Sequence, residues 1–248
     1  MNPEISAAVR SELAPSGTLR VGINLGNFLL VSSNPAGGEP RGIVVDLARE
    51  LGRRAALPVE FVSYGSAGTM AEAARSGAWD VAFLGAEPAR AGDIAFSAAY
   101  LEIEASCLVP AGSTLHAIED IDREGVRIAV ADKSAYDLFL SRSLRHARLV
   151  RAPGIDASFE LFVAEKLEAL AGLKPRLIAD AARIPGSRVL DGRFTAIQQA
   201  IGAPRGRDAA AEYLRAFAEH AKSSGLVAAA IERHKVEGVS VAPGASVR

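Results

Sequence analysis

The order in which two kinds of periodicity alternate along the chain constrains its fold more than any other feature. Short runs rich in branched and apolar residues, such as Leu19–Asn24 and Val59–Ser63, flank a segment in which Val44, Leu47 and Leu51 recur at helical spacing. Such alternation is typical of βα units that build a mostly parallel sheet covered by helices. The chain is therefore predicted to be an α/β protein.

The alternation occurs in two series, which predicts two lobes. Leu101–Pro110 is extended and leads out of the first series, and Phe194–Gly202 is extended and leads back into it. Between them, a second set of strands and helices begins with the strand Val126–Ala131. We therefore expect lobe 1 to comprise residues 18–102 and 195–236, lobe 2 to comprise 103–194, residues 1–17 to be an N-terminal extension, and 237–248 to be a loose tail.

Composition limits the classes of partner. The chain has 248 residues, of which 49% are hydrophobic and 23% charged, and a formal net charge of −1. These values are typical of a globular protein, and they lack the basic excess that nucleic acid or an anionic membrane surface would attract. No apolar run approaches the roughly 18 residues that a membrane span needs. We expect a small-molecule ligand, no nucleic acid, no direct membrane insertion and a monomer.

The N-terminal sequence leaves the compartment open. Residues 1–20 lack a basic stretch followed by an apolar one, so they do not read as a signal peptide. The location is periplasmic if a signal peptide was trimmed and cytoplasmic if Met1 is the native start. Cys107 is the single cysteine, and the four histidines lack metal-ligand spacing. No nucleotide or nucleophile motif is present either, so we expect no metal, no cofactor and no catalytic residue.

Several local strings in one order resemble a known family. They are LRVGIN, then Glu50-Leu51-Gly52, PVEFVSY and SGAWDV, and finally Arg90 followed by FSAAY. Over residues 18–235 the chain resembles the amino-acid-type, family 3 extracellular solute-binding proteins of the type II periplasmic-binding-protein superfamily. This resemblance implies two α/β lobes joined by two crossing strands, and a ligand held in the cleft by hinge closure. It also implies ABC transporter membrane subunits as partners.

The resemblance also implies ligand-binding residues in the first lobe. Arg90 matches the arginine that grips a carboxylate in this family. Asn27 follows the first strand, Tyr64 follows the second as an aromatic wall, and Gly85 follows the third, which is predicted over Trp79–Leu84. The chain departs from the family where Glu87 and the proline after it replace a hydroxyl residue that contacts the ligand, and the interval before Arg90 is short.

In the second lobe, Lys133 and Ser134 open a helix whose N-terminus is suited to an anion. Ser134 with an acid three residues later also matches a helix-capping box. The family's second-lobe acid, which pairs an ammonium group, should fall shortly after Glu168, where this chain has Leu-Ala-Gly-Leu over 170–173. This absence favours an organic acid or a modified amino acid as the ligand.

Three functions remain open from the sequence. The first is a solute-binding protein for an ABC transporter. The second is an enzyme on the same scaffold that resembles cyclohexadienyl dehydratase, in which Glu87 or Glu168 would protonate a leaving hydroxyl. The third is a cytoplasmic ligand sensor that acts through a partner protein, since no DNA-binding segment precedes Leu19.

Overall fold

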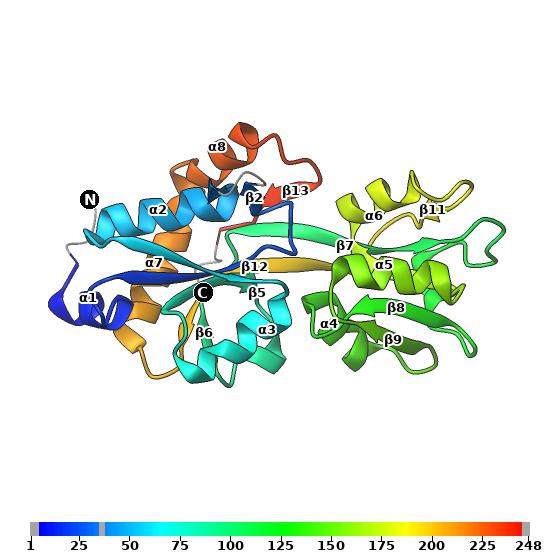
Figure 1. Cartoon of the computed structure of the whole chain (residues 1–248), viewed down its shortest axis with the longest axis horizontal. Coiled ribbons are helices and arrows are strands. Elements are labelled where there is room, and N and C mark those ends of the chain that lie inside the picture. Colours follow the sequence, from blue (N-terminus) through cyan, green and yellow to red (C-terminus); the bar gives the residue numbers. More distant parts are fainter. Residues whose placement is uncertain (1–4, 35–37, 245–248) are drawn as a thin grey trace. The chain divides into compact units, whose positions relative to one another are not determined.

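A computed structural model describes residues 5–34 and 38–244, and the chain divides into two compact units. Unit 1 comprises residues 1–102, 198–236 and 240–248, and unit 2 comprises residues 103–197 and 237–239. Two long strands, β7 (Leu101–Val109) and β12 (Thr195–Pro204), carry the chain over the boundaries at 102/103 and 197/198 (Figure 1). The sequence placed these boundaries at 102/103 and 194/195.

Unit 1 is built on a mostly parallel sheet with the strand order β4-β1-β5-β12. Strand β1 (Leu19–Asn24) pairs in parallel with β4 (Val59–Tyr64) and with β5 (Val81–Gly85). Strand β12 runs antiparallel to β5, and β6 (Ile94–Phe96) runs antiparallel to β12. Because β5 is buried along its whole length, it reads as a continuous apolar run instead of an alternating one.

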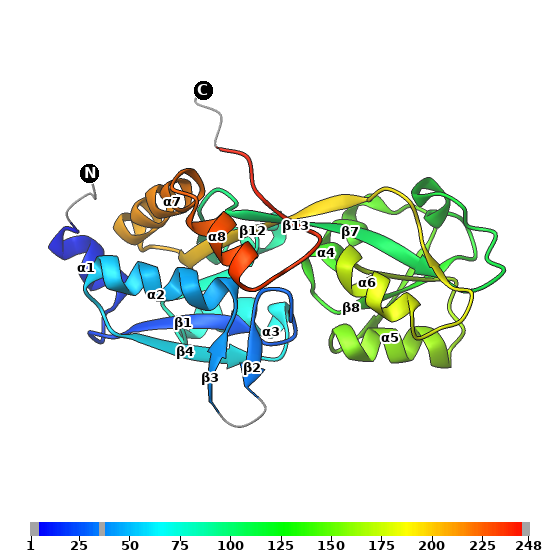
Figure 2. The ribbon, with the colours of Figure 1, turned by 90° about the horizontal axis from the view of Figure 1, so that it is seen from above.

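Helices cover both faces of this sheet. In Figure 1, α2 (Ile43–Ala55) lies above β1 and β4, while α3 (Ala67–Glu72), which continues into a 3-10 turn (Ala73–Ser76), lies below them. The buried ring of Trp79 is part of the core under α3, and its Nε1–H donates to the Met70 carbonyl at 2.8 Å. The remaining helices of unit 1 are α1 (Ala7–Leu13), which packs on α7 (Asp208–Ser223), and α8 (Leu226–Arg233), which packs on α2 and α7 (Figure 2).

A buried ion cluster joins the start of the sheet to α7. The carboxylate of Asp80 is fully buried and accepts hydrogen bonds from the Arg20 backbone N–H, Nε and Nη2 at 3.1, 2.9 and 2.8 Å. Arg207, which precedes α7, donates a further bond from Nη1 at 2.8 Å. Burial alone would raise the pKa of Asp80, but the hydrogen bonds from the two arginines outweigh it and the pKa lies below its usual value.

The entry into α2 depends on a glycine. Gly42 precedes the helix with φ of 130°, a conformation that side chains rarely adopt. A Cβ at this position would lie 2.3 Å from the Leu30 carbonyl oxygen. The backbone of Leu30 and Val31 therefore lies directly against the start of α2. These two residues precede a hairpin of β2 (Ser32–Asn34) and β3 (Gly38–Arg41).

The strands of unit 2 follow the order β7-β10-β8-β9, which continues the order given for unit 1 within a single hydrogen-bonded sheet. Strands β8 (Arg127–Ala131), β9 (Arg148–Ala152) and β10 (Ala169–Leu173) are parallel, and β7 is antiparallel to β10. The two-residue strand β11 (Arg188–Val189) pairs with β7. The other elements of unit 2 are the helices α4 (Ala135–Ser143), α5 (Ile155–Ala164) and α6 (Lys174–Ala181) and the 3-10 turn Ile118–Ile121.

Two expectations about the ends of the chain are wrong in part. Residues 1–17 are not a mere extension, because α1 packs on α7 and buries Leu13 completely. The tail is not loose as far as residue 242, because β13 (Val239–Val241) pairs with β7 and the Ala242 N–H donates to the Tyr100 carbonyl at 3.2 Å. The described residues beyond Ala242 form no helix or strand, and residues 245–248 lie outside the described part.

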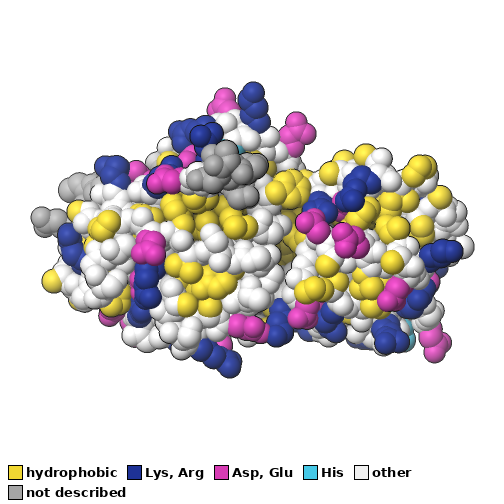
Figure 3. All heavy atoms as spheres, in the orientation of Figure 1, with side chains coloured by type: hydrophobic (Ala, Val, Ile, Leu, Met, Phe, Trp, Pro, Cys, Tyr) yellow, Lys and Arg dark blue, Asp and Glu magenta, His cyan; other side chains and the backbone are white. Residues whose placement is uncertain are grey.

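On the face seen in Figure 3, Lys and Arg side chains are interspersed with Asp and Glu side chains over both units. None of the helices in residues 5–34 and 38–244 combines the length and the apolar character that crossing a membrane requires.

Candidate ligand-binding site

In unit 1, the parallel strands place the loops that carry chemistry at one edge of the sheet. The carboxyl ends of β1, β4 and β5 lie side by side, and ligands of open α/β sheets bind beyond such ends. The loops also touch: the Leu25 N–H donates to the Tyr64 carbonyl at 2.9 Å. A Cβ on Gly26 would lie 2.5 Å from the Gly65 carbonyl oxygen, so this approach requires a glycine.

The loop after β1 carries a buried amide side chain. Asn27 is 7% exposed, and its Oδ1 has no hydrogen-bond partner among the described residues. Its backbone carbonyl accepts from the N–H groups of Leu30 and Val31, which fixes the turn. The next residue, Phe28, keeps 49% of its surface exposed although it is aromatic. The predicted residue Asn27 therefore lies at the predicted edge, next to an exposed aromatic ring.

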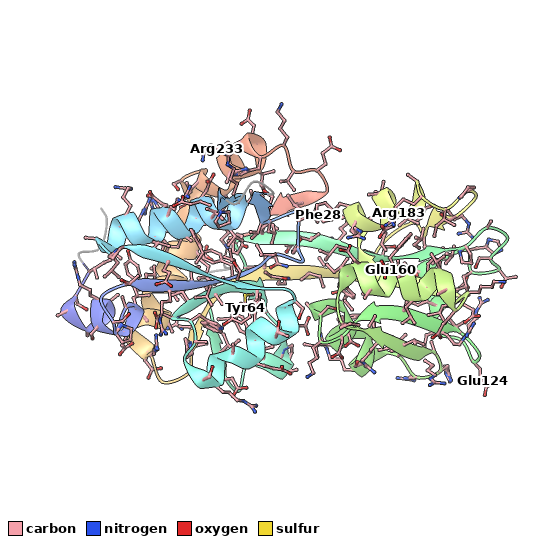
Figure 4. The ribbon with its side chains drawn as sticks, viewed as in Figure 1. Phe28, Tyr64, Glu124, Glu160, Arg183 and Arg233 are labelled. Carbon is pink, nitrogen blue, oxygen red and sulfur yellow. The ribbon has the colours of Figure 1, made fainter. Side chains whose placement is uncertain are left out.

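Tyr64 ends β4 and is partly buried against the cluster that contains Met70 and Trp79. Burial raises the pKa of its hydroxyl, and the charge of Arg20 opposes that rise. Figure 4 shows Tyr64 beside α3 and Phe28 beyond the end of β1, both in unit 1. Tyr64 thus ends β4, and Phe28 lies in the loop that follows β1.

The loop after β5 buries an arginine and an acid. Glu87 is 8% exposed and Arg90 is 5% exposed; Glu87 directly precedes a single 3-10 turn, Pro88–Arg90, which ends at the arginine. The Arg90 backbone N–H donates to the Glu87 carbonyl at 2.9 Å, and Arg90 Nη1 donates to the Gly85 carbonyl at 2.7 Å. Burial lowers the pKa of Arg90 to about 10, while the carboxylate of Glu87 opposes that fall. Because the segment between β5 and Arg90 is short, the guanidinium lies against Gly85, the last residue of β5.

Sequence reasoning missed one polar residue at this edge. Gln199 on β12 lies opposite Gly85 in the antiparallel register and is 5% exposed. Its neighbour Gln198 donates from Nε2 to Glu102 Oε1 at 2.9 Å. Two adjacent glutamines inside the apolar string TAIQQAIGA are the signal that could have drawn attention to this position.

In unit 2, the loop after β8 is occupied by helix capping. The Ser134 hydroxyl accepts from the Asp137 N–H at 3.1 Å, and the Asp137 carboxylate accepts from the Lys133 N–H at 2.8 Å. The capping box is therefore only half formed, because the acid takes the N–H one residue earlier than predicted. Lys133 has φ of 53°, in the left-handed region, and this turns its N–H toward Asp137. Both predicted residues are at the carboxyl end of β8, where their first contacts are structural.

The carboxyl end of β10 carries no acid among the described residues. Strand β10 closes with Leu173, which is 6% exposed, and Lys174 then donates from Nζ to Glu104 Oε2 at 3.0 Å. Asp132, after β8, lies 3.8 Å from Arg151. Glu168, the alternative acid, lies at the opposite end of β10 and pairs with Arg127 at 2.9 Å. The structure thus places Glu168 away from the carboxyl edge of its own sheet.

Many solved structures are similar to this chain, and three of them illustrate the likeness. The solute receptor for L-cysteine of Neisseria gonorrhoeae superposes with a TM-score of 0.78 at 21% identity, and the match covers 92% of this chain and 95% of that one. A putative ABC transporter binding component of Wolinella succinogenes, complexed with lysine, gives 0.74 at 19% identity, with coverage of 88% and 95%. An ancestral amino acid-binding protein, a precursor of cyclohexadienyl dehydratase, gives 0.73 at 21% identity, with coverage of 90% and 98%.

These likenesses establish the predicted two-lobed α/β fold of type II periplasmic binding proteins. A search among curated proteins finds no match. The model of the family described as bacterial extracellular solute-binding proteins, family 3, matches residues 19–236. The match runs from the first strand of unit 1 through α8, so it includes both units and all the loops described above. The chain belongs to the family 3 bacterial extracellular solute-binding proteins.

Proposed function

We propose that this protein captures a small carboxylate-bearing molecule, either amino-acid-like or an organic acid, and delivers it to the membrane subunits of an ABC transporter. The observation that supports this proposal is Arg90, a guanidinium 5% exposed at the ligand-side edge of the unit 1 sheet. An arginine shielded from water gains more from a carboxylate than an exposed one does, because the pair is poorly screened. The Gly85 carbonyl fixes one of its nitrogen atoms and orients the rest of the fork.

The similar proteins support this class of ligand. One is a receptor for L-cysteine, and another was solved with lysine as a component of an ABC transporter. Both ligands are amino acids with a free carboxylate. Ligand contacts from Lys133 and Ser134 remain predictions, because capping occupies the Ser134 acceptor and the Lys133 N–H. An extracellular location, as the family description has it, belongs to the same proposal.

Thermal unfolding and calorimetry against a ligand panel test the proposal. The panel contains amino acids, dicarboxylates and aromatic acids, each with its amide. A ligand that binds only the folded state stabilises it by about 2.7 kcal/mol at a hundredfold excess over Kd. We expect acids to stabilise the protein and their amides not to do so. The same hits are then incubated and assayed for turnover, which tests the dehydratase-like alternative.

Arg90 is tested by Arg90→Lys and Arg90→Ala, with Arg75→Ala as the matched control. Arg75 belongs to the same unit, and its side chain is 77% exposed and paired with Asp93. A charge-assisted hydrogen bond contributes about 1.5–3 kcal/mol, so we expect Arg90 variants to weaken binding about 10- to 150-fold. Arg75→Ala should leave affinity unchanged. Equal affinity in wild type and Arg90→Lys, with both proteins folded, would refute the role of Arg90.

A further inference from the structure

The segment after α8 crosses the boundary between the two units a third time. Residues 198–236 belong to unit 1, residues 237–239 belong to unit 2, and the chain from residue 240 on belongs to unit 1 again. The crossing includes β13, which pairs with β7 and is labelled in Figure 2. We call residues 237–243 the strap. The strap is thus a further covalent link between the units, besides β7 and β12.

The strap is fixed in unit 2 by a close approach at Gly238. This residue has φ of 71°, in the left-handed region that favours glycine. A Cβ there would lie 2.4 Å from Cγ of Pro175 and 3.2 Å from its Cβ. Pro175 belongs to the first turn of α6, and its ring cannot swing aside as a flexible side chain would. Gly238 therefore lies directly on α6, and a larger residue would displace the strap from it.

In unit 1, the strap is held by hydrogen bonds directly after β13. The Ala242 N–H donates to the Tyr100 carbonyl at 3.2 Å, and Ala242 is 4% exposed. Lys222, near the end of α7, donates from Nζ to the Pro243 carbonyl at 2.8 Å. The Lys222 side chain is 5% exposed, and its charge is compensated by Glu219 at 2.8 Å. A buried, paired ammonium therefore fixes this end of the strap.

The distance between the two anchors is limited by a very short piece of chain. Only β13 lies between Gly238 and Ala242, and its three residues are already extended. Four Cα-to-Cα steps span about 13 Å in a strand and at most about 14 Å in a fully stretched chain. The strap can therefore lengthen by only about 1 Å. A larger displacement of one anchor from the other must break the contact with Pro175 or the hydrogen bonds in unit 1.

We propose that the strap limits how far the two units can move relative to one another, in addition to the two crossing strands. It acts as a tether of fixed length with one end in each unit. Capture and release of a ligand by hinge closure require such movement, so the purpose of the strap rests on the proposed function. Releasing either end should widen the range of arrangements that the ligand-free protein samples.

Distances between two spin labels, one in each unit, test the inference without a ligand. The labels are attached to Arg75→Cys in unit 1 and Glu160→Cys in unit 2, because both side chains are exposed. Cys107 is completely buried, so the reagent should modify the introduced cysteines alone. Double electron–electron resonance then gives the distribution of distances between the labels.

Two variants release the strap, and each has a matched control. Gly238→Ala frees the end in unit 2, and its control is Gly112→Ala, because Gly112 lies in the same unit with φ of 73° and a Cβ there would meet no atom within 4 Å. Lys222→Met removes the bond to Pro243, and its control is Glu219→Gln, which removes the ion pair but keeps the lysine donor.

We expect Gly238→Ala and Lys222→Met to broaden the distribution by at least about 2 Å, more than the roughly 1 Å by which the anchored strap can lengthen. Both controls should match wild type. Thermal unfolding of each variant distinguishes a purely structural role: a lower Tm with an unchanged distribution would overturn the inference, as would equal broadening in Gly112→Ala. If Gly238→Ala does not fold, Lys222→Met decides alone, since it leaves α6 untouched. Failure of every ligand of the panel to bind would refute the proposed function and leave the distance result standing.

Discussion

Replacing Asp80 by asparagine should destabilise unit 1 through its buried ion cluster. The variant keeps the shape of the side chain but removes the charge that compensates Arg20 and Arg207. In the variant, an amide N–H₂ group would also face guanidinium donors that in wild type contact the carboxylate oxygen atoms of Asp80. Breaking a buried ion pair from one side costs about 3–5 kcal/mol, and we take the lower end, about 3 kcal/mol, because the Arg20 and Arg207 side chains are 30% and 19% exposed.

Urea unfolding followed by circular dichroism measures this loss. With a slope of about 3 kcal/mol per molar for a chain of this size, the midpoint should fall by about 1 M. Glu39→Gln is the control: this acid pairs with Arg49, its side chain is 81% exposed, and exposed pairs contribute at most about 1 kcal/mol. An Asp80→Asn variant no less stable than Glu39→Gln would refute the reasoning.

The difference in stability between wild type and Asp80→Asn should depend on pH. Because the pKa of Asp80 is lowered by folding, its contribution to stability is fully present above the unfolded pKa, near 4. The contribution is lost as pH falls through the still lower pKa of the folded state. We therefore expect the difference between wild type and Asp80→Asn to be constant from about pH 5 to 8 and to shrink below about pH 4. A difference that persisted unchanged at pH 3 would contradict the assigned charge state.

Two further predictions concern backbone and capping positions. Gly42→Ala forces a Cβ against the Leu30 carbonyl at a φ of 130°. We expect the free energy of unfolding, measured by urea titration, to fall by at least about 1–3 kcal/mol. An unchanged free energy of unfolding would show that the turn relaxes freely. Lys133→Gly removes a side chain from a left-handed position, so the free energy of unfolding should be unchanged or about 1 kcal/mol higher. Ser134→Ala removes the N-cap of α4, so the free energy of unfolding should be about 1 kcal/mol lower. Calorimetry on Lys133→Gly then tests whether that ammonium contacts ligand, since unchanged affinity would remove Lys133 from the site.

Sequence periodicity predicted the strands and helices that bury an apolar face. The strand Leu19–Asn24 has the predicted bounds, and the crossing strand β7 begins at the predicted residue. Elements that depend on distant contacts were not predicted. Strand β13 lies in a Gly- and Pro-containing tail and forms only because it pairs with β7, and α1 is held by its packing on α7. The local sequence pattern of a segment does not show which distant segment it pairs with.

Some features of the candidate site were likewise predicted from the sequence, and others were not. The order of the strands predicted that the loops of Asn27, Tyr64 and Arg90 lie at one edge, because parallel strands end together. The sequence did not reveal that Glu87 and Arg90 are both buried, since exposure depends on the surrounding elements. Nor did it reveal that Asp137 occupies the Lys133 N–H, because this depends on a left-handed backbone conformation that lysine rarely adopts.

The discontinuity of unit 1 has a consequence for the order in which the nascent chain acquires structure. Unit 2 is nearly contiguous, so it lacks only the late pairing of β13 with β7 once residues 103–197 have left the ribosome. Unit 1 at that stage still lacks β12, which pairs with β5, and the helices α7 and α8 that cover it. Long-range pairing of this kind is slow and leaves apolar strands exposed in the meantime. We therefore expect the N-terminal half of unit 1 to be the part that chaperones hold during synthesis, although it is made first.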